Sequence, residues 1–514
     1  MATAEVVAPQ NVKVTPPVEH VPDPCVIVIF GASGDLTKRK LLPALFHLQQ
    51  SGLLPKNFAV VGVARRELGS SFAEDMKEGI VQSDKVKDDG KMKEVDDFIS
   101  RVSYHAMNFD DHAGYEKLND TLEQIDREHG TGGNRLFYLA TAPEYFAEIV
   151  RQLAVHGMTK NEDGKSWARC IIEKPFGHDL QSARELSDEV NKYLSEDQIF
   201  RIDHYLGKET VQNILVFRFA NGIFEPIWNR NYVDSVEITA AEEIGIEGRG
   251  PFYEKAGTLR DVVQNHVMEL MSFVAMEPPG SFEADAMRRE KIKVWRAVKP
   301  VPLEDTVRGQ YGPAKVDGKD IVGYRQEDRV NPQSQTETFV ALKLEIENWR
   351  WAGVPFYLRA GKRLKKRETG ITVLFKKAPL RLFRQSAGAK CDELLPNIIT
   401  MRIQPDEGIS LRFAAKVPGP NMNMAPVMMD FNYAQAFGVS SANGYERLLL
   451  DAMLGDATLF AHRDGVEATW AIMTPILEKW AQNPVKDFPN YAAGSWGPKA
   501  ADELLKRDGR AWQE

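Results

Sequence analysis

Between Cys25 and about Phe200, short apolar runs rich in β-branched residues alternate with longer amphipathic segments. The runs CVIVIF, AVVGVA, VSYHAMNF, RLFYLA and ARCIIEKP predict strands, and the intervening segments predict helices over residues 38–51, 71–81, 113–128, 144–156 and 179–194. Strands that are apolar along their whole length and are separated by helices are typical of a doubly wound, mostly parallel sheet. We therefore predict an α/β domain of Rossmann type over residues 25–202.

The second half of the chain follows a different pattern. Alternating segments of strand type occur at residues 234–240, 338–346, 371–375, 398–403 and 409–413. Because helices are missing over much of residues 330–415, antiparallel pairing is favoured there. Helical patterns return at residues 252–276, 446–461 and 465–482. The pattern predicts a larger α+β domain over residues 203–514 with a mostly antiparallel sheet.

Composition and charge exclude several classes of protein. A net charge of −8 and a pI near 5.8 disfavour a general nucleic-acid or anionic-membrane binder. The three cysteines, Cys25, Cys170 and Cys391, are far apart, which argues against a disulfide framework or a thiolate metal site. Residues 1–24 contain several prolines and no apolar core of signal-peptide length, so they predict a flexible tail. We expect a cytoplasmic protein without a bound metal, a nucleic-acid partner or a membrane partner.

The first predicted strand runs directly into the glycine-rich turn GASGDL, which opens a helix. Gly31 and Gly34 would let backbone amides approach a pyrophosphate, and the helix N-terminus would supply partial positive charge for it. The third glycine of the usual dinucleotide pattern is missing, so an ordinary tight turn is the alternative. The position after the first strand of a βαβ unit favours a dinucleotide site.

The second predicted strand ends in Arg65-Arg66, where an NAD enzyme usually presents an acid to the adenosine ribose. An arginine at this position favours the 2′-phosphate of NADP. Glu67 keeps NAD open as the weaker alternative, and a solvated charge pair is also compatible with the sequence.

Lys174 lies in the motif EKPFG at the end of a predicted strand, on the edge where ligands of open α/β sheets bind. A surface lysine is the simpler interpretation when this residue is considered alone.

A possible acid–base pair comes from two segments about 60 residues apart. The stretch RIDHYLGKET brings Asp203 close to a histidine, a tyrosine and a lysine, and RDVVQNH places His266 beside the apolar stripe of a predicted helix. A single histidine in that position is more often a satisfied core residue. However, Asp203, Asp261 and Asn265 are acceptors that could orient its imidazole.

Residues 359–367, RAGKRLKKR, form a basic run in an acidic chain. Such a run is usually a solvated face, and a nuclear signal or nucleic-acid patch is also conceivable. Arg359 and Lys362 closely follow the strand-like VPFYL, so we expect part of the run to face a cleft. A small phosphorylated anion could be attracted there.

Taken together and in this order, GASGDL, EKPFG, RIDHYLGKE, the EGRG and RDVVQNH pair, and RAGKRL resemble the glucose-6-phosphate dehydrogenase family. The resemblance covers residues 25–510. It implies oxidation of D-glucose 6-phosphate to 6-phospho-D-glucono-1,5-lactone with hydride transfer to NADP, the first step of the oxidative pentose phosphate pathway. It also implies that His266 is the general base, that Asp203 orients it, and that the protein is a homodimer or homotetramer.

The resemblance further implies two sets of binding residues. For the sugar phosphate they are Lys174, His204, Tyr205, Lys208, Glu242, Asp261, Lys362, Arg367 and Gln404. For NADP they are Gly31, Ser33, Gly34, Asp35, Leu36 and Arg65, with Lys174 between the cofactor and the substrate.

Two other functions are compatible with parts of the pattern. A sugar or polyol dehydrogenase of similar two-domain build would carry Glu-Lys-Pro after a Rossmann strand but would need no phosphate clamp. A non-catalytic NADP-sensing protein would not need a base on the helix, and the presence of both Asp203 and His266 argues against it.

Overall fold

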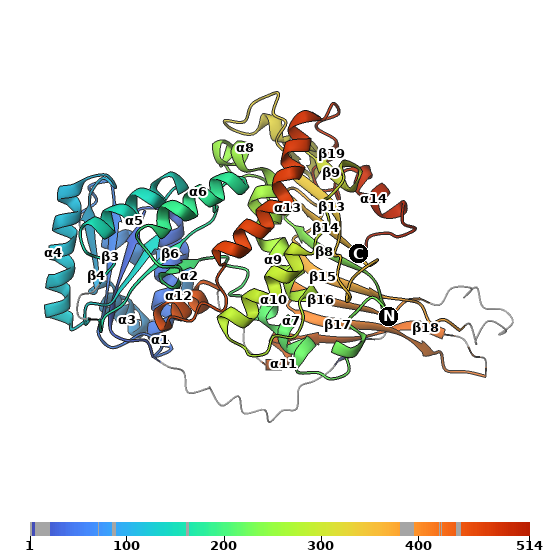
Figure 1. Cartoon of the computed structure of the whole chain (residues 1–514), viewed down its shortest axis with the longest axis horizontal. Helices are drawn as coiled ribbons and strands as arrows, with labels where there is room; N and C mark the ends of the chain where they lie inside the picture. The colour runs from blue at the N-terminus through green and yellow to red at the C-terminus, as the bar shows by residue number, and fades with distance from the viewer. Residues whose placement is uncertain are drawn as a thin grey trace.

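The structure is a computed structural model that describes residues 3–5, 21–69, 71–84, 89–160, 164–380, 395–420, 422, 424–437 and 444–513. It contains a parallel sheet followed by a larger sheet of mostly antiparallel strands, with helices of the second half between them (Figure 1). The predicted fold class is therefore confirmed. Cys391 and most of the expected N-terminal tail, residues 1–24, lie outside the described residues.

The first sheet has six strands in the order β4-β3-β2-β5-β6-β7, all of them parallel. The chain moves outward from the central strand in one direction and then returns to build the other half, so the order reverses between β2 and β5. In open α/β sheets, ligands bind at such a point, outside the carboxyl ends of the strands. The strands are β2 (Cys25–Phe30), β3 (Phe58–Ala64), β4 (Val102–Ala106), β5 (Arg135–Leu139), β6 (Ala168–Ile172) and β7 (Ile199–Arg201).

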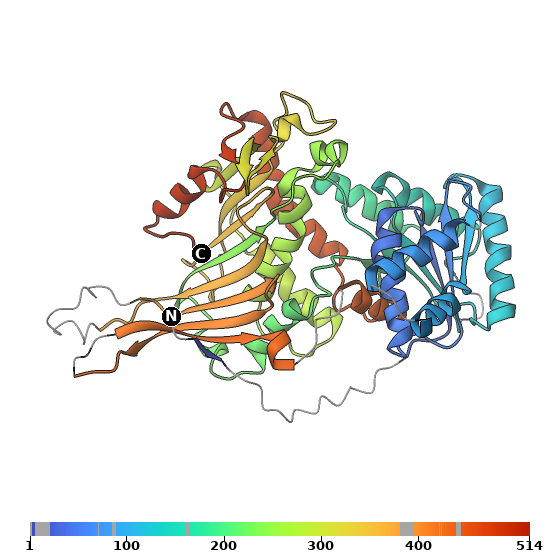
Figure 2. The same ribbon diagram turned by 180° about the vertical axis from the view of Figure 1, so that it is seen from behind.

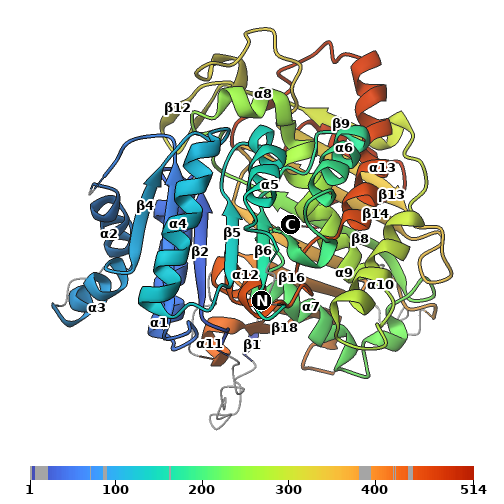
Figure 3. The ribbon, with the colours of Figure 1, turned by 60° about the vertical axis from the view of Figure 1, so that its left-hand side comes forward.

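Both faces of this sheet are covered, which explains why its strands are apolar along their length. On β2, Ile27 and Ile29 pack into the cluster that contains α1, α2 and α3, while Val28 and Phe30 pack with α4 and α5. This alternation follows from the two-residue repeat of a strand. Figure 3 shows α4 and α5 in front of the strands. The helices are α1 (Leu42–Gln50), α2 (Ser71–Asp84), α3 (Asp89–Ile99), α4 (His112–His129), α5 (Phe146–Val155) and α6 (Leu180–Asn191).

The second sheet has nine strands in the order β1-β18-β17-β16-β15-β8-β14-β13-β9. Only the pairs β1–β18 and β8–β14 are parallel among its described strands. All five predicted segments form strands here, and β17 and β18 extend away from the helices (Figure 2). The strands are β1 (Thr3–Glu5), β8 (Val233–Ala241), β9 (Thr306–Gly309), β13 (Phe339–Glu345), β14 (Pro355–Gly361), β15 (Glu368–Phe375), β16 (Ile398–Gln404), β17 (Gly408–Lys416) and β18 (Met424–Asn432).

Most of the remaining helices connect the two sheets or cover the second one, and one of them packs against α1 and β6 of the first domain. They are α7 (Glu209–Phe219), α8 (Gly250–Thr258), α9 (Met268–Ala275), α10 (Ala284–Arg296), α11 (Tyr433–Phe437), α12 (Gly444–Leu454), α13 (Arg463–Gln482) and α14 (Lys499–Lys506). Two small ribbons pair β10 (Tyr311–Gly312) with β19 (Tyr491–Ala492) and β11 (Ala314–Val316) with β12 (Lys319–Ile321). Within the described part of the chain, no helix combines the length and apolarity needed to cross a bilayer.

Two predicted helices differ from the structure. The helix expected over residues 446–461 ends at Leu454, because Gly455 adopts a positive φ of 81°. The helix expected over residues 252–276 is broken at Gly257, where φ is 63° and an added Cβ would lie 2.4 Å from Glu337 Oε1. The same carboxylate accepts a 3.0 Å hydrogen bond from the backbone N of Leu259, so Glu337 caps the segment that follows the break.

That following segment is η5 (Leu259–Val267), a π-helical stretch that leads directly into α9. π-Helical turns are rare and occur frequently at functional sites. The segment carries both Asp261 and His266, two of the predicted site residues.

The far end of α9 is held by side chains from three distant segments. The carbonyls of residues 273–276, which a helix leaves without internal partners, accept hydrogen bonds of 2.7–2.9 Å from Arg218, Trp228 and Trp351. Arg218 and both tryptophans are fully buried. The end of the helix that begins beside His266 is therefore fixed by donors from the end of α7, the segment before β8 and the turn before β14.

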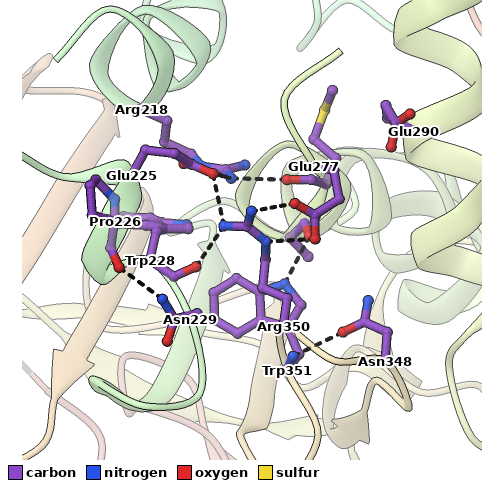
Figure 4. Close-up of polar contacts among 12 residues, drawn as sticks. Arg218, Glu225, Pro226, Trp228, Asn229, Glu277, Glu290, Asn348, Arg350 and Trp351 are labelled. Carbon is purple, nitrogen blue, oxygen red and sulfur yellow. Dashed lines mark hydrogen bonds and ion pairs between the residues drawn. The ribbon is translucent and has the colours of Figure 1, made fainter. Parts of the chain in front are cut away.

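An ion network surrounds this helix end (Figure 4). Arg218 pairs with Glu225 at 3.0 Å, Arg350 pairs with the same carboxylate at 2.8 Å, and Arg350 also contacts Glu277. Because Glu277 follows α9 directly, the network links that helix to the turn between β13 and β14.

Candidate active site

Several of the predicted site residues come from one loop and one helix that converge at the carboxyl edge of the parallel sheet. The loop between β7 and α7 carries Asp203, His204, Tyr205 and Lys208, and η5 carries His266. In sequence these segments are separated by about 60 residues, and the structure brings them into direct contact.

Asp203 and His266 form a buried pair. Nδ1 of His266 lies 2.5 Å from Oδ1 of Asp203, and each side chain is 4% exposed. The same Oδ1 accepts a 2.9 Å hydrogen bond from the backbone N of Tyr205, whose ring stacks on the imidazole with centroids 4.2 Å apart. Asn265 accepts a hydrogen bond from the backbone N of His266, so it holds the main chain and not the ring. The hydrogen bond to Asp203 therefore fixes the imidazole at Nδ1, and the Tyr205 ring covers one of its faces.

The charge state of the pair follows from its surroundings. Burial lowers the pKa of His266 and Lys174 lowers it further, while Asp203 works in the opposite direction. Burial alone would raise the pKa of Asp203, but the charge and hydrogen bond of His266 hold it well below the usual range. A neutral imidazole whose Nδ1–H donates to an ionised Asp203 leaves Nε2 unprotonated and able to accept, which is the state a general base requires.

Lys174 reaches this second nitrogen from the end of β6. Its Nζ lies 2.8 Å from Nε2 of His266 and donates a 2.8 Å hydrogen bond to the backbone oxygen of Asp261. The Asp261 carboxylate lies 3.3 Å from the same ammonium. Burial opposes ionisation of Asp261, but Lys174 and Lys362 bring its pKa down to about 2. Lys174 thus lies between His266 and the carboxyl ends of the strands of the parallel sheet.

A polar cluster with two cations lies beside Tyr205. Lys208 donates to Oε1 of Gln404, and Arg367 reaches the same oxygen at 3.4 Å. The amide nitrogen of Gln404 donates to the hydroxyls of Tyr205 and Thr369 at 3.2 and 3.0 Å. Gln404 and Thr369 face each other across β16 and β15, so the sheet register brings these two side chains together. Two cations and two hydroxyl or amide donors at one point suit a dianionic phosphate.

Glu242 and Lys362 form a third group. They follow β8 and β14, the parallel pair in which Ala241 lies opposite Gly361. Because parallel neighbours deliver the residues after them to the same edge, Lys362 Nζ lies 2.5 Å from Glu242 Oε2. A carboxylate and an ammonium side by side can accept from and donate to sugar hydroxyls.

A cleft of about 530 Å³ opens at the point where the strand order reverses, and Gly31, Ser33, Gly34 and Arg65 line it. Gly31 has a φ of 83°, and an added Cβ would lie 2.3 Å from the carbonyl oxygen of Ala140. Only glycine fits there, so the backbone can approach a ligand closely. The cleft fits the pyrophosphate and ribose of a dinucleotide.

Arg65 lies at the rim of this cleft and is held by aromatic groups that sequence reasoning did not assign. Its guanidinium carbon lies 5.9 Å from the Phe109 ring centroid and 5.4 Å from that of Tyr145, and Nη1 donates to the Tyr145 hydroxyl at 3.1 Å. Arg66 and Thr141 also line the cleft.

Asp35 and Leu36 do not line this cleft. Asp35 is exposed and pairs with Arg39 at 2.6 Å on the first helical turn. Their contact with a cofactor stays a prediction.

Sequence reasoning also missed Tyr445 and Glu173. The ring of Tyr445, at the start of α12, stacks on His204 with an interplanar angle of 6° and bonds to Glu173. Tyr138 also donates to Glu173 at 2.6 Å. Burial raises the pKa of Glu173 to about 7. Tyr445 is about 240 residues away from His204 in the sequence, so no local pattern could have identified it.

The potential ligand atoms of Asp203, His204 and His266 lie within 4.8 Å of one another. The ammonium of Lys174 lies 2.8 Å from one of the imidazole nitrogens and would repel a cation there. The expectation that no metal binds here stays a prediction.

Comparison with known proteins identifies the family. Residues 28–213 match the glucose-6-phosphate dehydrogenase NAD binding domain, and residues 215–513 match the glucose-6-phosphate dehydrogenase C-terminal domain. The glucose-6-phosphate 1-dehydrogenase of Chlamydia pneumoniae is 51% identical over 494 residues, which cover 95% of this chain and 96% of that protein. The enzyme of the same name from Bacillus subtilis is 45% identical over 491 residues, or 95% and 98% of the two chains.

Solved structures agree with the sequence relatives. A glucose-6-phosphate dehydrogenase in complex with its substrate glucose-6-phosphate superposes with a TM-score of 0.86 at 36% identity, over 96% of this chain and 99% of that one. The glucose-6-phosphate 1-dehydrogenase of Mycobacterium avium gives 0.81 at the same identity and coverage. With both halves matched and the fold shared along almost its whole length, the chain belongs to the glucose-6-phosphate dehydrogenase family.

Proposed function

We propose that this oxidoreductase oxidises D-glucose 6-phosphate to 6-phospho-D-glucono-1,5-lactone with NADP as hydride acceptor. The observation that carries the proposal is the buried Asp203–His266 pair, in which the second nitrogen of the imidazole faces Lys174 after β6. The reaction would be the first step of the oxidative pentose phosphate pathway.

In this proposal His266 Nε2 removes the proton from the 1-hydroxyl while hydride leaves the anomeric carbon and the carbonyl of the lactone forms. NADP supplies the acceptor for that hydride when it is bound. Asp203 stabilises the imidazolium that results, because its carboxylate lies 2.5 Å from Nδ1. Lys174 moves from Nε2 to the substrate oxygen, which is the direction its charge favours as the oxygen loses its proton.

The phosphate end is held by Lys208, His204 and Tyr205, with Arg367 and Gln404 adding contacts from the second sheet. Glu242, Asp261 and Lys362 would contact the sugar hydroxyls. Charge-assisted contacts to a dianionic phosphate are strong enough to fix the position of the anomeric carbon. In this view residues 25–202 bind NADP, residues 203–514 bind the substrate, and the cofactor contacts include Asp35 and Leu36.

The proposal extends to the assembly and its place in the cell. We propose a homodimer or homotetramer in the cytoplasm. Met429 on β18 and Phe437 on α11 are 43% and 46% exposed, and their apolar surface supports an interface at the edge of the second sheet. Light scattering on the purified protein measures the number of subunits.

The direct test is a spectrophotometric assay of cofactor reduction with glucose 6-phosphate and NADP, repeated with glucose and with NAD. We expect glucose 6-phosphate to be strongly preferred over glucose. His266→Asn should lower kcat by about 10²- to 10⁴-fold with little change in the KM for substrate. Higher activity on unphosphorylated glucose would favour a different sugar dehydrogenase, and an unchanged kcat in the variant would remove His266 from the base role.

A further inference from the structure

Only one oxygen of the Asp203 carboxylate takes part in the contacts described above. Its Oδ1 binds His266 and the backbone N of Tyr205, but its Oδ2 is buried and has no hydrogen-bond partner among the residues that the structure describes. A buried carboxylate oxygen without a partner is costly and is rare in native proteins. This oxygen belongs to a residue on which the proposed base depends.

A small cavity of about 30 Å³ lies against Asp203 and Lys174. A single water needs about 10 to 15 Å³ of water-centre volume and two to four polar partners. Polar side chains supply them here, and those in the wall are Asp203, Lys174, Gln264, Asn265, Thr469 and Glu269. The cavity therefore has the size and the lining for one water molecule.

Glu269 places a second carboxylate on the wall of the same cavity. It lies on α9, three residues after His266, and its Oε2 is 2.6 Å from Nζ of Lys291 on α10. The two side chains are 8% and 4% exposed, so this ion pair is buried. The ammonium also lies within 5.5 Å of the ring centroids of Phe273 and Trp295. A lysine this deep inside the protein is unusual, and the reaction as described above does not use it.

We propose that Glu269 and Lys291 are positioning residues for the reaction, and that they act on the Asp203–His266 pair across the water-sized cavity. A water that donates to Asp203 Oδ2 keeps this carboxylate ionised. Lys291 balances the charge of Glu269. The Glu269 carboxylate therefore neither repels the Asp203 carboxylate nor favours protonation of the His266 imidazole. The inference rests on the proposed role of His266 as base.

Several other charged or titratable groups face this pair, and they stay unchanged in the test. They are Lys174 after β6, Asp261 on η5, His204 and Tyr205 after β7, and Glu173 with Tyr445 beside His204. Burial raises the pKa of Glu269, the charge of Asp203 raises it further, and Lys291 opposes both.

The test changes one charge at a time. Glu269→Gln leaves the Lys291 cation unbalanced and should lower the pKa of His266, whereas Lys291→Met leaves the Glu269 anion unbalanced and should raise it. An uncompensated unit charge roughly 10 Å from a titrating group, at an effective dielectric of about 20, changes a pKa by about one unit. The double variant restores neutrality, so its His266 should titrate close to the wild-type value.

The readout is the NMR titration of labelled histidine in the full-length protein, with the His266 signal assigned by its loss in His266→Gln. Where Lys291→Met does not fold, Lys291→Gln gives the same charge change and retains a hydrogen bond. The acidic limb of the kcat profile should move in parallel with the NMR value. Because the NMR titration requires no turnover, a failure to oxidise glucose 6-phosphate would overturn the proposed function and leave this test intact.

Glu225→Gln is the matched control, since it breaks another ion pair, between the half-buried Glu225 and the buried Arg218, at the opposite end of α9. It should reduce stability without moving the His266 titration. Equal His266 pKa values in the wild type and both single variants would overturn the inference, and so would a shift of the same sign in both.

Discussion

Nζ of Lys174 lies 2.8 Å from Nε2 of His266, the nitrogen that would accept the proton in the proposed mechanism. Without substrate, the ammonium therefore donates to this imidazole nitrogen. The contact also keeps the imidazole neutral, because a protonated ring would place two cations together. The same lysine is bonded to Asp261 on the helix, so its position is set before substrate arrives.

Removing this ammonium should change the pH dependence of the reaction. Lys174 lowers the pKa of His266, so in Lys174→Met that pKa should rise. A base works when it is unprotonated; activity is lost as the pH falls through its pKa, and in the variant this loss should begin at a higher pH. The pH profile of kcat measures the shift. Lys299→Met, which removes a surface lysine paired with Glu345, should leave the profile unchanged.

Asp203→Asn tests how the imidazole is oriented. An amide can donate to Nδ1, which would favour the tautomer with its proton on Nε2 and leave no acceptor for the 1-hydroxyl. We expect kcat to fall by about 10²- to 10⁴-fold with a nearly unchanged KM.

The control for this substitution is Asp451→Asn, which alters another buried aspartate that pairs with Arg447 on α12. It should lower the melting temperature more than it lowers kcat. If Asp203→Asn kept wild-type turnover, Asp203 would have no orienting role.

Lys208 should make substrate binding depend on pH. Burial and the nearby Arg367 lower its pKa to about 8. A lysine is charged below its pKa, so the charge that attracts the phosphate is present below pH 8 and is lost as the pH rises through this value. The KM for glucose 6-phosphate should then increase by up to about tenfold per pH unit. The KM for unphosphorylated glucose should not change with pH over the same range.

Lys208→Arg provides the check on this assignment, because a guanidinium keeps its charge throughout the range. The rise in KM above pH 8 should disappear in this variant. A rise that persists would assign the titration to another group.

Arg65 should decide between the two cofactors. Arg65→Gln removes the cation at the rim of the nucleotide cleft, and we expect the KM for NADP to increase about 10- to 100-fold with little effect on NAD. Steady-state kinetics with both cofactors measure this. Tyr145→Phe keeps the ring beneath the guanidinium and removes only the 3.1 Å hydrogen bond, so its effect should be smaller. Equal losses with NADP and NAD would contradict a 2′-phosphate contact.

Much of the fold could be predicted because its local patterns are strong. The apolar strands of the parallel sheet are buried on both faces, as the runs CVIVIF and AVVGVA indicate. Five α-helices of the described residues, α3, α7, α10, α11 and α14, were not predicted. α3 and α10 have mostly charged surfaces, and α7 is apolar on several sides without one clear stripe. The break at Gly257 depends on Glu337, which is 80 residues away in the sequence and leaves no local signal.

The candidate site could likewise be predicted only in part. RIDHYLGKET and RDVVQNH could be recognised as candidate functional segments because their polar residues interrupt apolar patterns. Contacts between distant segments could not be recognised, as with Tyr445 on His204 or Glu269 on the cavity behind Asp203. Such residues look like ordinary helix positions until the chain is folded.

The helix-end network in Figure 4 predicts a loss of stability. Arg218→Met leaves the Glu225 carboxylate without its buried partner and two helix carbonyls without donors, so unfolding should require about 3–5 kcal/mol less free energy. Chemical denaturation measures the difference. Arg329→Met, at an exposed pair with Asp328, should behave as the wild type. A wild-type denaturation midpoint for Arg218→Met would contradict the anchoring role.

The capping of α9 also has a consequence for how the protein is made. His266 and its helix are synthesised well before Trp351, yet the carbonyl of Ala275 finds its donor only in that tryptophan. A nascent chain that has emerged only as far as β13 carries both Asp203 and His266 but lacks the tryptophan donor for the far end of α9. This helix end is thus fixed late, when the turn between β13 and β14 has formed.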